Sequence, residues 1–173
     1  SLENFSDLLF KEDLDSENSS ILSSFNYDMS VRDYYNEISN EQLKIVGDEN
    51  SIMDWTDADN DYTYYVDNAN GTGLGPNGIS HSAAALVVEI AKENDAMGLD
   101  FNYYDGNQDG EVDVIILIAE GWMDYDRDTH FWPHMSYILS GTGNNRIEAI
   151  GSDTSAAGYF SLDGMTIKKY III

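Results

Sequence analysis

The residues whose spacing best fits a chemical role lie in the stretch DGNQDGEVD, from Asp105 to Asp113. Oxygen-bearing side chains occupy alternate positions of this stretch: Asp105, Asn107, Asp109, Glu111 and Asp113. On a tight loop, alternate side chains turn to the same side, and oxygen ligands of this kind suit Ca²⁺. Gly110 provides the sharp bend, which a side chain would oppose. The spacing therefore predicts a structural calcium loop.

The loop differs from an EF-hand at one decisive position. Counted from Asp105, the twelfth residue is Ile116, where an EF-hand places its bidentate glutamate. Asp113 or a distant segment would have to supply the missing carboxylate. The alternative is a polar turn in which Asp and Asn side chains accept hydrogen bonds from their own backbone. Both interpretations remain open at this point.

Other constellations are weaker. His130 and His134 are four residues apart, but Pro133 disfavours the helix that would bring their rings together on one zinc ion. We expect His134 to be a hydrogen-bonded structural residue instead. The acidic stretch Asp57–Asp61 has oxygen side chains that suit help in binding an ion, but it is more typical of a solvated turn. The glycine-rich stretch Asp67–Gly78 follows no clear strand, which argues against phosphate binding. The chain has no cysteine and no Gly-x-Ser-x-Gly motif for nucleophilic catalysis.

The net charge of the chain limits the classes of partner that it can bind. Thirty-two acidic residues face eight basic ones, a net charge of −24 in 173 residues, which excludes nucleic acid and anionic membrane surfaces as partners. No apolar stretch is long enough to span a membrane. The charge suits divalent cations, an extracellular setting or a salt-loving host. The hydrophobic content of 42% predicts a folded chain despite this charge.

Hydrophobic periodicity predicts a mixed sheet with two main helices, an α/β or α+β fold in one domain over residues 1–173. One helix should follow the cap Ser30, with Val31, Tyr34, Tyr35 and Ile38 facing the core, and the longer one should run from Ser80 to about Asn94. Strands or strand ends are expected in seven segments. These are Ser1–Phe10, Leu43–Trp55, Tyr62–Val66, Val112–Ala119 (buried), Arg146–Ile150, Tyr159–Leu162 and Met165–Ile173. Asp163-Gly164 predicts a two-residue hairpin turn between the last two.

Five segments match, in the same order, the motifs of one known family. They are NFSD at Asn4–Asp7, SVRDYYNEIS at Ser30–Ser39, LDFNYYDGNQDGEVDVIILIAEG at Leu99–Gly121, FWPH at Phe131–His134 and DGMTIKKYIII at Asp163–Ile173. In this order they resemble the immune inhibitor A family of secreted bacterial metallopeptidases. The first departs from the family pattern, because Asn4 stands where the family has Asp.

The resemblance implies a zincin-type fold, in which a helix carries His-Glu-x-x-His, both histidines bind zinc and the glutamate polarises the attacking water. No His-Glu-x-x-His occurs in these residues. We therefore expect the N-terminal, non-catalytic part of a secreted zinc metallopeptidase domain, which cleaves protein or peptide substrates only at full length. The apolar end Tyr170–Ile173 also fits a piece of a longer protein. The alternative is a calcium-stabilised extracellular binding or adhesion module without catalysis.

Overall fold

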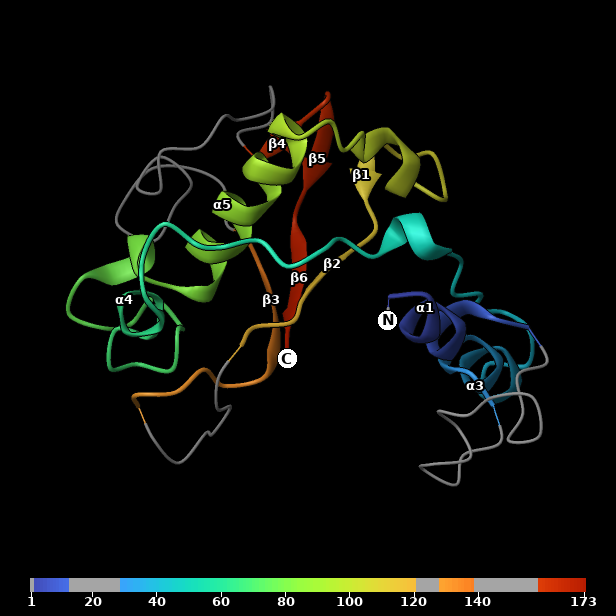
Figure 1. The fold of residues 1–173 in the computed structure, drawn as a ribbon, viewed down its shortest axis with the longest axis horizontal. Coiled ribbons are helices and arrows are strands. Elements are labelled where there is room, and N and C mark those ends of the chain that lie inside the picture. Colours follow the sequence, from blue (N-terminus) through green and yellow to red (C-terminus); the bar gives the residue numbers. More distant parts are fainter. Residues whose placement is uncertain (1, 13–28, 121–127, 139–158) are drawn as a thin grey trace. The chain divides into compact units, whose positions relative to one another are not determined.

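The computed structural model describes residues 2–12, 29–120, 128–138 and 159–173 (Figure 1). The chain divides into two compact units, Ser1–Trp55 and Thr56–Ile173, and each is described by itself. The described residues form a mixed α+β fold with a few helices and two small mixed sheets. This confirms the expected mixture of helices and sheet strands. The single domain over residues 1–173 stays a prediction.

The first unit contains the helices α1 (Leu2–Phe10) and α3 (Val31–Ile38), which contact each other, and the 3₁₀ turn η1 (Glu49–Ser51). The expected edge strand at residues 1–10 is wrong, because this run has no glycine, proline or β-branched residue and forms α1. The expected strands in Leu43–Trp55 are also wrong. These residues have no ladder partner and form irregular backbone with η1.

Helix α3 begins as its sequence predicts. Ser30 is the N-cap, and its Oγ accepts a hydrogen bond from the Asp33 N–H at 3.1 Å. The expected core face is wrong, since Tyr34, Tyr35 and Ile38 are 48%, 39% and 59% exposed. Helical spacing defines a face, but it cannot say whether another element covers that face. The two tyrosine rings pack edge-to-face on each other, with centroids 5.2 Å apart.

In the second unit the helices are α4 (Tyr62–Val66) and α5 (Ala83–Ala96), with the 3₁₀ turns η2 (Gly78–Ser80) and η3 (Phe101–Tyr104). Tyr62–Val66 is therefore not a strand, because Asp61 caps a helix there. Asp61 Oδ1 accepts hydrogen bonds from the N–H groups of Thr63 at 2.9 Å and Tyr64 at 3.2 Å. The long helix is confirmed, but its cap is Ser82 rather than Ser80, with Ser82 Oγ accepting from the Ala85 N–H at 3.2 Å.

Six strands form two three-stranded sheets, in the orders β1-β5-β4 and β2-β6-β3. Their bounds are β1 Glu111–Val112, β2 Ile115–Leu117, β3 His134–Tyr137, β4 Ser161–Leu162, β5 Met165–Ile167 and β6 Lys169–Ile172. β1 and β2 pair in parallel with β5 and β6, whereas β4 and β3 pair antiparallel with them. The expected strand Arg146–Ile150 lies outside the described residues.

The hairpin at Asp163-Gly164 is confirmed. Both residues have positive φ, 51° and 81°, as a type I′ turn requires, and β4 and β5 flank them. The expected buried strand Val112–Ala119 is confirmed as a strand segment but not as buried. It divides into β1 and β2 at Asp113-Val114, and Ile116 and Ile118 are 54% and 42% exposed.

The core of this unit lies between α5 and one face of the strands. α5 contacts β6, and its buried residues meet apolar side chains from the strands and loops. The fully buried large side chains of the core are Tyr65, Val66, Val87, Phe131, Ile138, Phe160, Ile167 and Ile172. Because α5 is anchored in this way, the side chains on its solvent-facing side have defined positions.

Candidate cation sites

Hydrogen bonds donated by backbone N–H groups hold both ends of the loop from Asp105 to Asp113. Before it, the buried Phe101 donates its N–H to Asp163 Oδ2 at 2.9 Å, which ties η3 to the β4–β5 turn. After it, the Asp113 N–H donates to Tyr104 O at 3.0 Å, and the Thr166 N–H of β5 donates to Gly110 O at 2.9 Å. The hairpin that the sequence predicts therefore positions the loop that the sequence singles out.

Inside the loop, the side chains turn inward onto the backbone. Asp105 accepts from two N–H groups, that of Asp109 at 3.0 Å on Oδ1 and that of Gly110 at 2.9 Å on Oδ2. Asn107 Oδ1 also accepts from the Asp109 N–H at 3.0 Å, and Asp109 Oδ1 accepts from the Glu111 N–H at 2.9 Å. Gly110 has a φ of 83°, so the sharp bend expected at this glycine is present. These bonds are those of the polar-turn interpretation.

The remaining two predicted ligands lie differently. Glu111 Oε1 forms an ion pair with Lys168 Nζ, and this hydrogen bond raises the pKa of Lys168. Asp113 Oδ2 accepts from the Gly106 N–H at 3.3 Å, across the mouth of the loop. Asp105, Asn107 and Asp109 thus share one turn, while Glu111 is engaged by a lysine. Calcium binding stays a prediction. The oxygen-only donor set and the bend at Gly110 fit the ion, and a bound ion would draw the carboxylate oxygens toward the inside of the loop.

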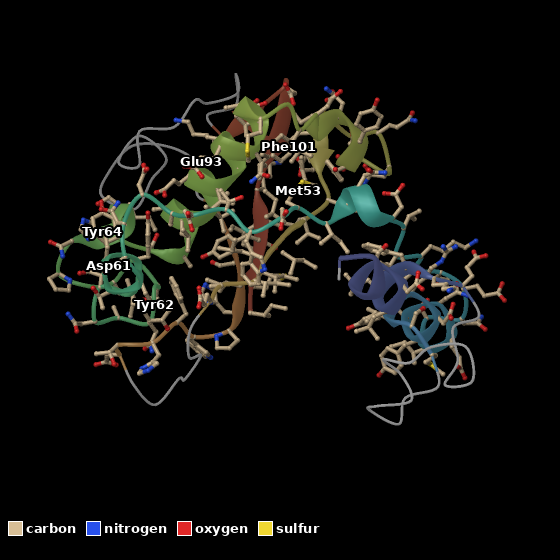
Figure 2. The ribbon with its side chains drawn as sticks, in the orientation of Figure 1. Met53, Asp61, Tyr62, Tyr64, Glu93 and Phe101 are labelled. Atoms are coloured by element: carbon tan, nitrogen blue, oxygen red, sulfur yellow. The ribbon has the colours of Figure 1, made fainter. Side chains whose placement is uncertain are left out.

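A second acidic group lies on α5 and the segment before α4. Ligand atoms of Asp59, Glu89 and Glu93 lie within 4.8 Å of one another, and Glu89 and Glu93 are half-buried. Figure 2 shows Glu93 on α5 and Asp61 at the start of α4. Within the part of the chain that the structure describes, this is the trio of carboxylates close enough together to share a metal ion.

Hydrogen bonds organise this group around Glu89. Its Oε1 accepts from the Asp59 N–H and its Oε2 from the Tyr65 hydroxyl, each at 2.6 Å. Burial and the hydrogen bond to Glu89 raise the pKa of Tyr65 to about 12. Burial, then the negative charges of Glu89, Asp59 and Asp57, raises the pKa of the Glu93 carboxyl. The arrangement concentrates negative charge, so a divalent cation would relieve repulsion here.

The sequence contained two signals for this acidic group, but neither indicated that its three residues lie close together. Glu89 and Glu93 are four residues apart on a predicted helix, which puts them on one face. Asp59 lies in the acidic stretch expected to be a solvated turn. Only the packing of the pre-α4 segment against α5 brings the three together, and periodicity contains no information on that packing.

The histidines are engaged in structural contacts. His134 Nδ1 donates to Trp132 O, because a carbonyl can only accept, and Nε2 is hydrogen-bonded to the Tyr170 hydroxyl at 3.1 Å. Burial raises the pKa of Tyr170 to about 12. His130 Nδ1 instead meets Thr129 Oγ1 at 3.1 Å. His134 is hydrogen-bonded, as expected, and its structural role stays a prediction.

No model of a known protein family matches the chain, and a search of curated proteins finds no significant match. Among the residues that the structure describes, no helix is both long and apolar enough to cross a membrane.

Proposed function

We propose that this chain is the N-terminal part of a secreted zinc metallopeptidase of the immune inhibitor A type, and that its Asp105–Asp113 loop binds a structural Ca²⁺. The observation that carries the proposal is the tie between this loop and the β4–β5 hairpin. Two of the five segments that resemble the family, Leu99–Gly121 and Asp163–Ile173, meet through the Phe101–Asp163 bond of 2.9 Å and the parallel pairing of β1 with β5. The resemblance itself still rests on the sequence segments alone.

In this proposal the calcium ion acts on the fold rather than on a substrate. Asp105, Asn107 and Asp109 supply oxygen ligands from one turn, and Asp113 closes the loop from the strand side. The ion would neutralise carboxylates that otherwise repel one another and would fix the start of β1. A loop fixed in this way holds the register of the parallel strands, on which the rest of a peptidase domain would be built.

The zinc of the family does not fit the residues present. The chain has no His-Glu-x-x-His, and both ring nitrogens of His134 are hydrogen-bonded to Trp132 and Tyr170. We therefore assign no zinc ligand and no catalytic step to this chain. Cleavage of protein or peptide substrates outside the cell belongs, in this proposal, to the full-length protein.

Hydrolysis of casein by the purified chain tests this division of labour. The expected result is no cleavage above background, with or without added Zn²⁺, because the residues that bind zinc and polarise water are missing. A protein extended with the coding sequence that follows Ile173 serves as the comparison, and we expect its cleavage to be lost on chelation with 1,10-phenanthroline. Chelator-sensitive cleavage by the shorter chain alone contradicts the proposal.

The second candidate function is a calcium-stabilised extracellular binding module without catalysis. The open apolar sheet face described below favours it, because such a face suits association with a partner. The discriminating observation is the coding sequence after Ile173. A His-Glu-x-x-His there supports the peptidase, whereas its absence from the whole protein supports the binding module.

A further inference from the structure

The sheet β2-β6-β3 has an exposed face that is almost entirely apolar. In its central row, Ile116 of β2 pairs with Ile171 of β6, which pairs with Met135 of β3. Alternate residues of a strand point to the same face, so this face continues in both directions along the strands. Its other members are Val114, Ile118, Pro133, Tyr137, Lys169 and Ile173.

The exposure of its side chains shows that the described residues of the Thr56–Ile173 unit leave this face uncovered. Ile116, Met135 and Tyr137 are 54%, 61% and 50% exposed, and Ile173 is 49% exposed. The opposite face is closed, because Tyr170 and Ile172 are buried against the core that includes α5. Strands that pair in parallel and read as continuous apolar runs are normally covered on both faces. The run Val114–Ala119 has that composition, but the described residues of its own unit cover only one of its sides.

The size of the face suits one helix. Three strands span about 10 Å between the outer two, and five residues along a strand span about 13 Å. A single α-helix about 10 Å in diameter covers such an area with two or three turns. A second sheet would extend well beyond the apolar positions.

The net charge of the chain indicates which residues such a helix would carry. The chain carries a net charge of −24, and the exposed Glu120 lies two residues beyond Ile118, while Lys169 is the one basic residue of the face. A second copy of the chain would bring another −24 toward the face and be repelled, as would an anionic membrane. A helix with basic residues beside an apolar stripe would be attracted to this face both by apolar burial and by the opposite charge of the chain.

We propose that the exposed face of β2-β6-β3 is a docking surface for a cationic amphipathic helix of a partner protein. The apolar stripe of the helix packs on Ile116, Ile171 and Met135. Its lysines or arginines lie toward Glu120, beyond the end of β2, and away from Lys169. This inference does not depend on the proposed peptidase or on calcium.

A synthetic 14-residue helix of leucine and lysine, labelled with a fluorophore, serves as the probe, and anisotropy reports its binding to the whole chain. Ile116→Glu is compared with Leu74→Glu, a matched change at a side chain that is 80% exposed on another segment. Both variants add one negative charge, so general attraction for the probe rises equally in both. We expect Ile116→Glu to weaken binding about tenfold or more and Leu74→Glu to leave it unchanged. Equal affinities overturn the proposal.

Two further measurements on the unmodified chain keep the test decisive. In peroxide, Met135 should oxidise at a rate close to that of Met97, which is 70% exposed, and far faster than Met165, which is 7% exposed. Oxidation of Met135 as slow as that of Met165 means that the chain already covers this face, and it overturns the proposal. Light scattering should find a monomer, while a dimer that Ile116→Glu dissociates assigns the face to a second copy instead.

Discussion

Gly71→Ala should be among the most damaging single-methyl changes in the Thr56–Ile173 unit. A Cβ at this position would lie 2.4 Å from Phe131 Cδ1, and Gly71 has a φ of 72°. Phe131 is only 1% exposed and has no room to withdraw. The backbone of Gly71 is equally held, because its N–H donates to Val66 O at 3.0 Å and its carbonyl accepts from the Ala83 N–H at 2.8 Å.

Two costs add at this position. A non-glycine residue in the left-handed region costs about 1–2 kcal/mol. Overpacking of a buried ring costs about 1–3 kcal/mol. The free energy of unfolding should therefore fall by about 2–5 kcal/mol, a large share of the roughly 5–15 kcal/mol typical of a domain.

The control is Gly164→Ala in the β4–β5 turn. Its φ is 81°, but nothing lies within 4 Å of the added Cβ, so only the backbone cost of about 1–2 kcal/mol applies. Urea unfolding, followed by tryptophan fluorescence, gives both free energies. The difference between the variants isolates the contact with Phe131. If Gly71→Ala lowers the free energy of unfolding no more than Gly164→Ala does, the argument that Gly71 packs tightly against Phe131 is refuted.

Two predictions concern titration. Because burial raises the pKa of Tyr170 to about 12, the unfolded chain ionises this phenol first, and stability falls as the pH rises from about 10 toward 12. Urea unfolding at pH 8 and 11 should show a loss of about 1.4 kcal/mol from this group; a Tyr170→Phe variant that loses as much stability as wild type refutes it. The raised pKa of Glu93 means that its stabilising contribution is present at low pH and is lost as the pH rises through the folded-state pKa. Glu93→Gln should therefore stabilise the chain at pH 7 more than at pH 4; an effect of equal size at the two pH values contradicts the crowding of acids on α5.

Local signals predicted the parts of the fold that local forces determine. Asp163-Gly164 specifies its hairpin because few other residue pairs accept two positive φ values in succession. Ser30 specifies the start of α3 because its side chain satisfies a free N–H group. At Tyr62–Val66 the aromatic and β-branched residues favoured a strand, and the cap at Asp61 outweighed them.

Features that depend on contacts between distant segments could not be predicted from these local signals. The segment Leu43–Trp55 alternates like a strand, but a strand needs a partner, and alternation does not supply one. The approach of Asp59 to Glu89 and Glu93 depends on how the segment before α4 packs on α5. The apolar run Val112–Ala119 predicted a buried strand, and the described residues of its unit cover only the α5 side. In each case the missing information is which element lies opposite.

The central claim, a calcium ion on the Asp105–Asp113 loop, is tested most directly by thermal melting. The chain is melted in EDTA and then in increasing CaCl₂ at constant NaCl, alongside Asp105→Asn, which removes one ligand charge but keeps a carbonyl acceptor for one of the two loop N–H groups that Asp105 binds. Glu93→Gln controls for the acidic group on α5. At a hundredfold excess of Ca²⁺ over Kd, linkage stabilises the folded state by about 2.7 kcal/mol.

For a chain of this size, that free energy raises Tm by about 5–10 °C. We predict this rise for wild type and for Glu93→Gln, and little or none for Asp105→Asn. A melting temperature that does not respond to Ca²⁺, that responds equally to NaCl, or that Asp105→Asn leaves responsive contradicts the claim, and the loop is then a polar turn.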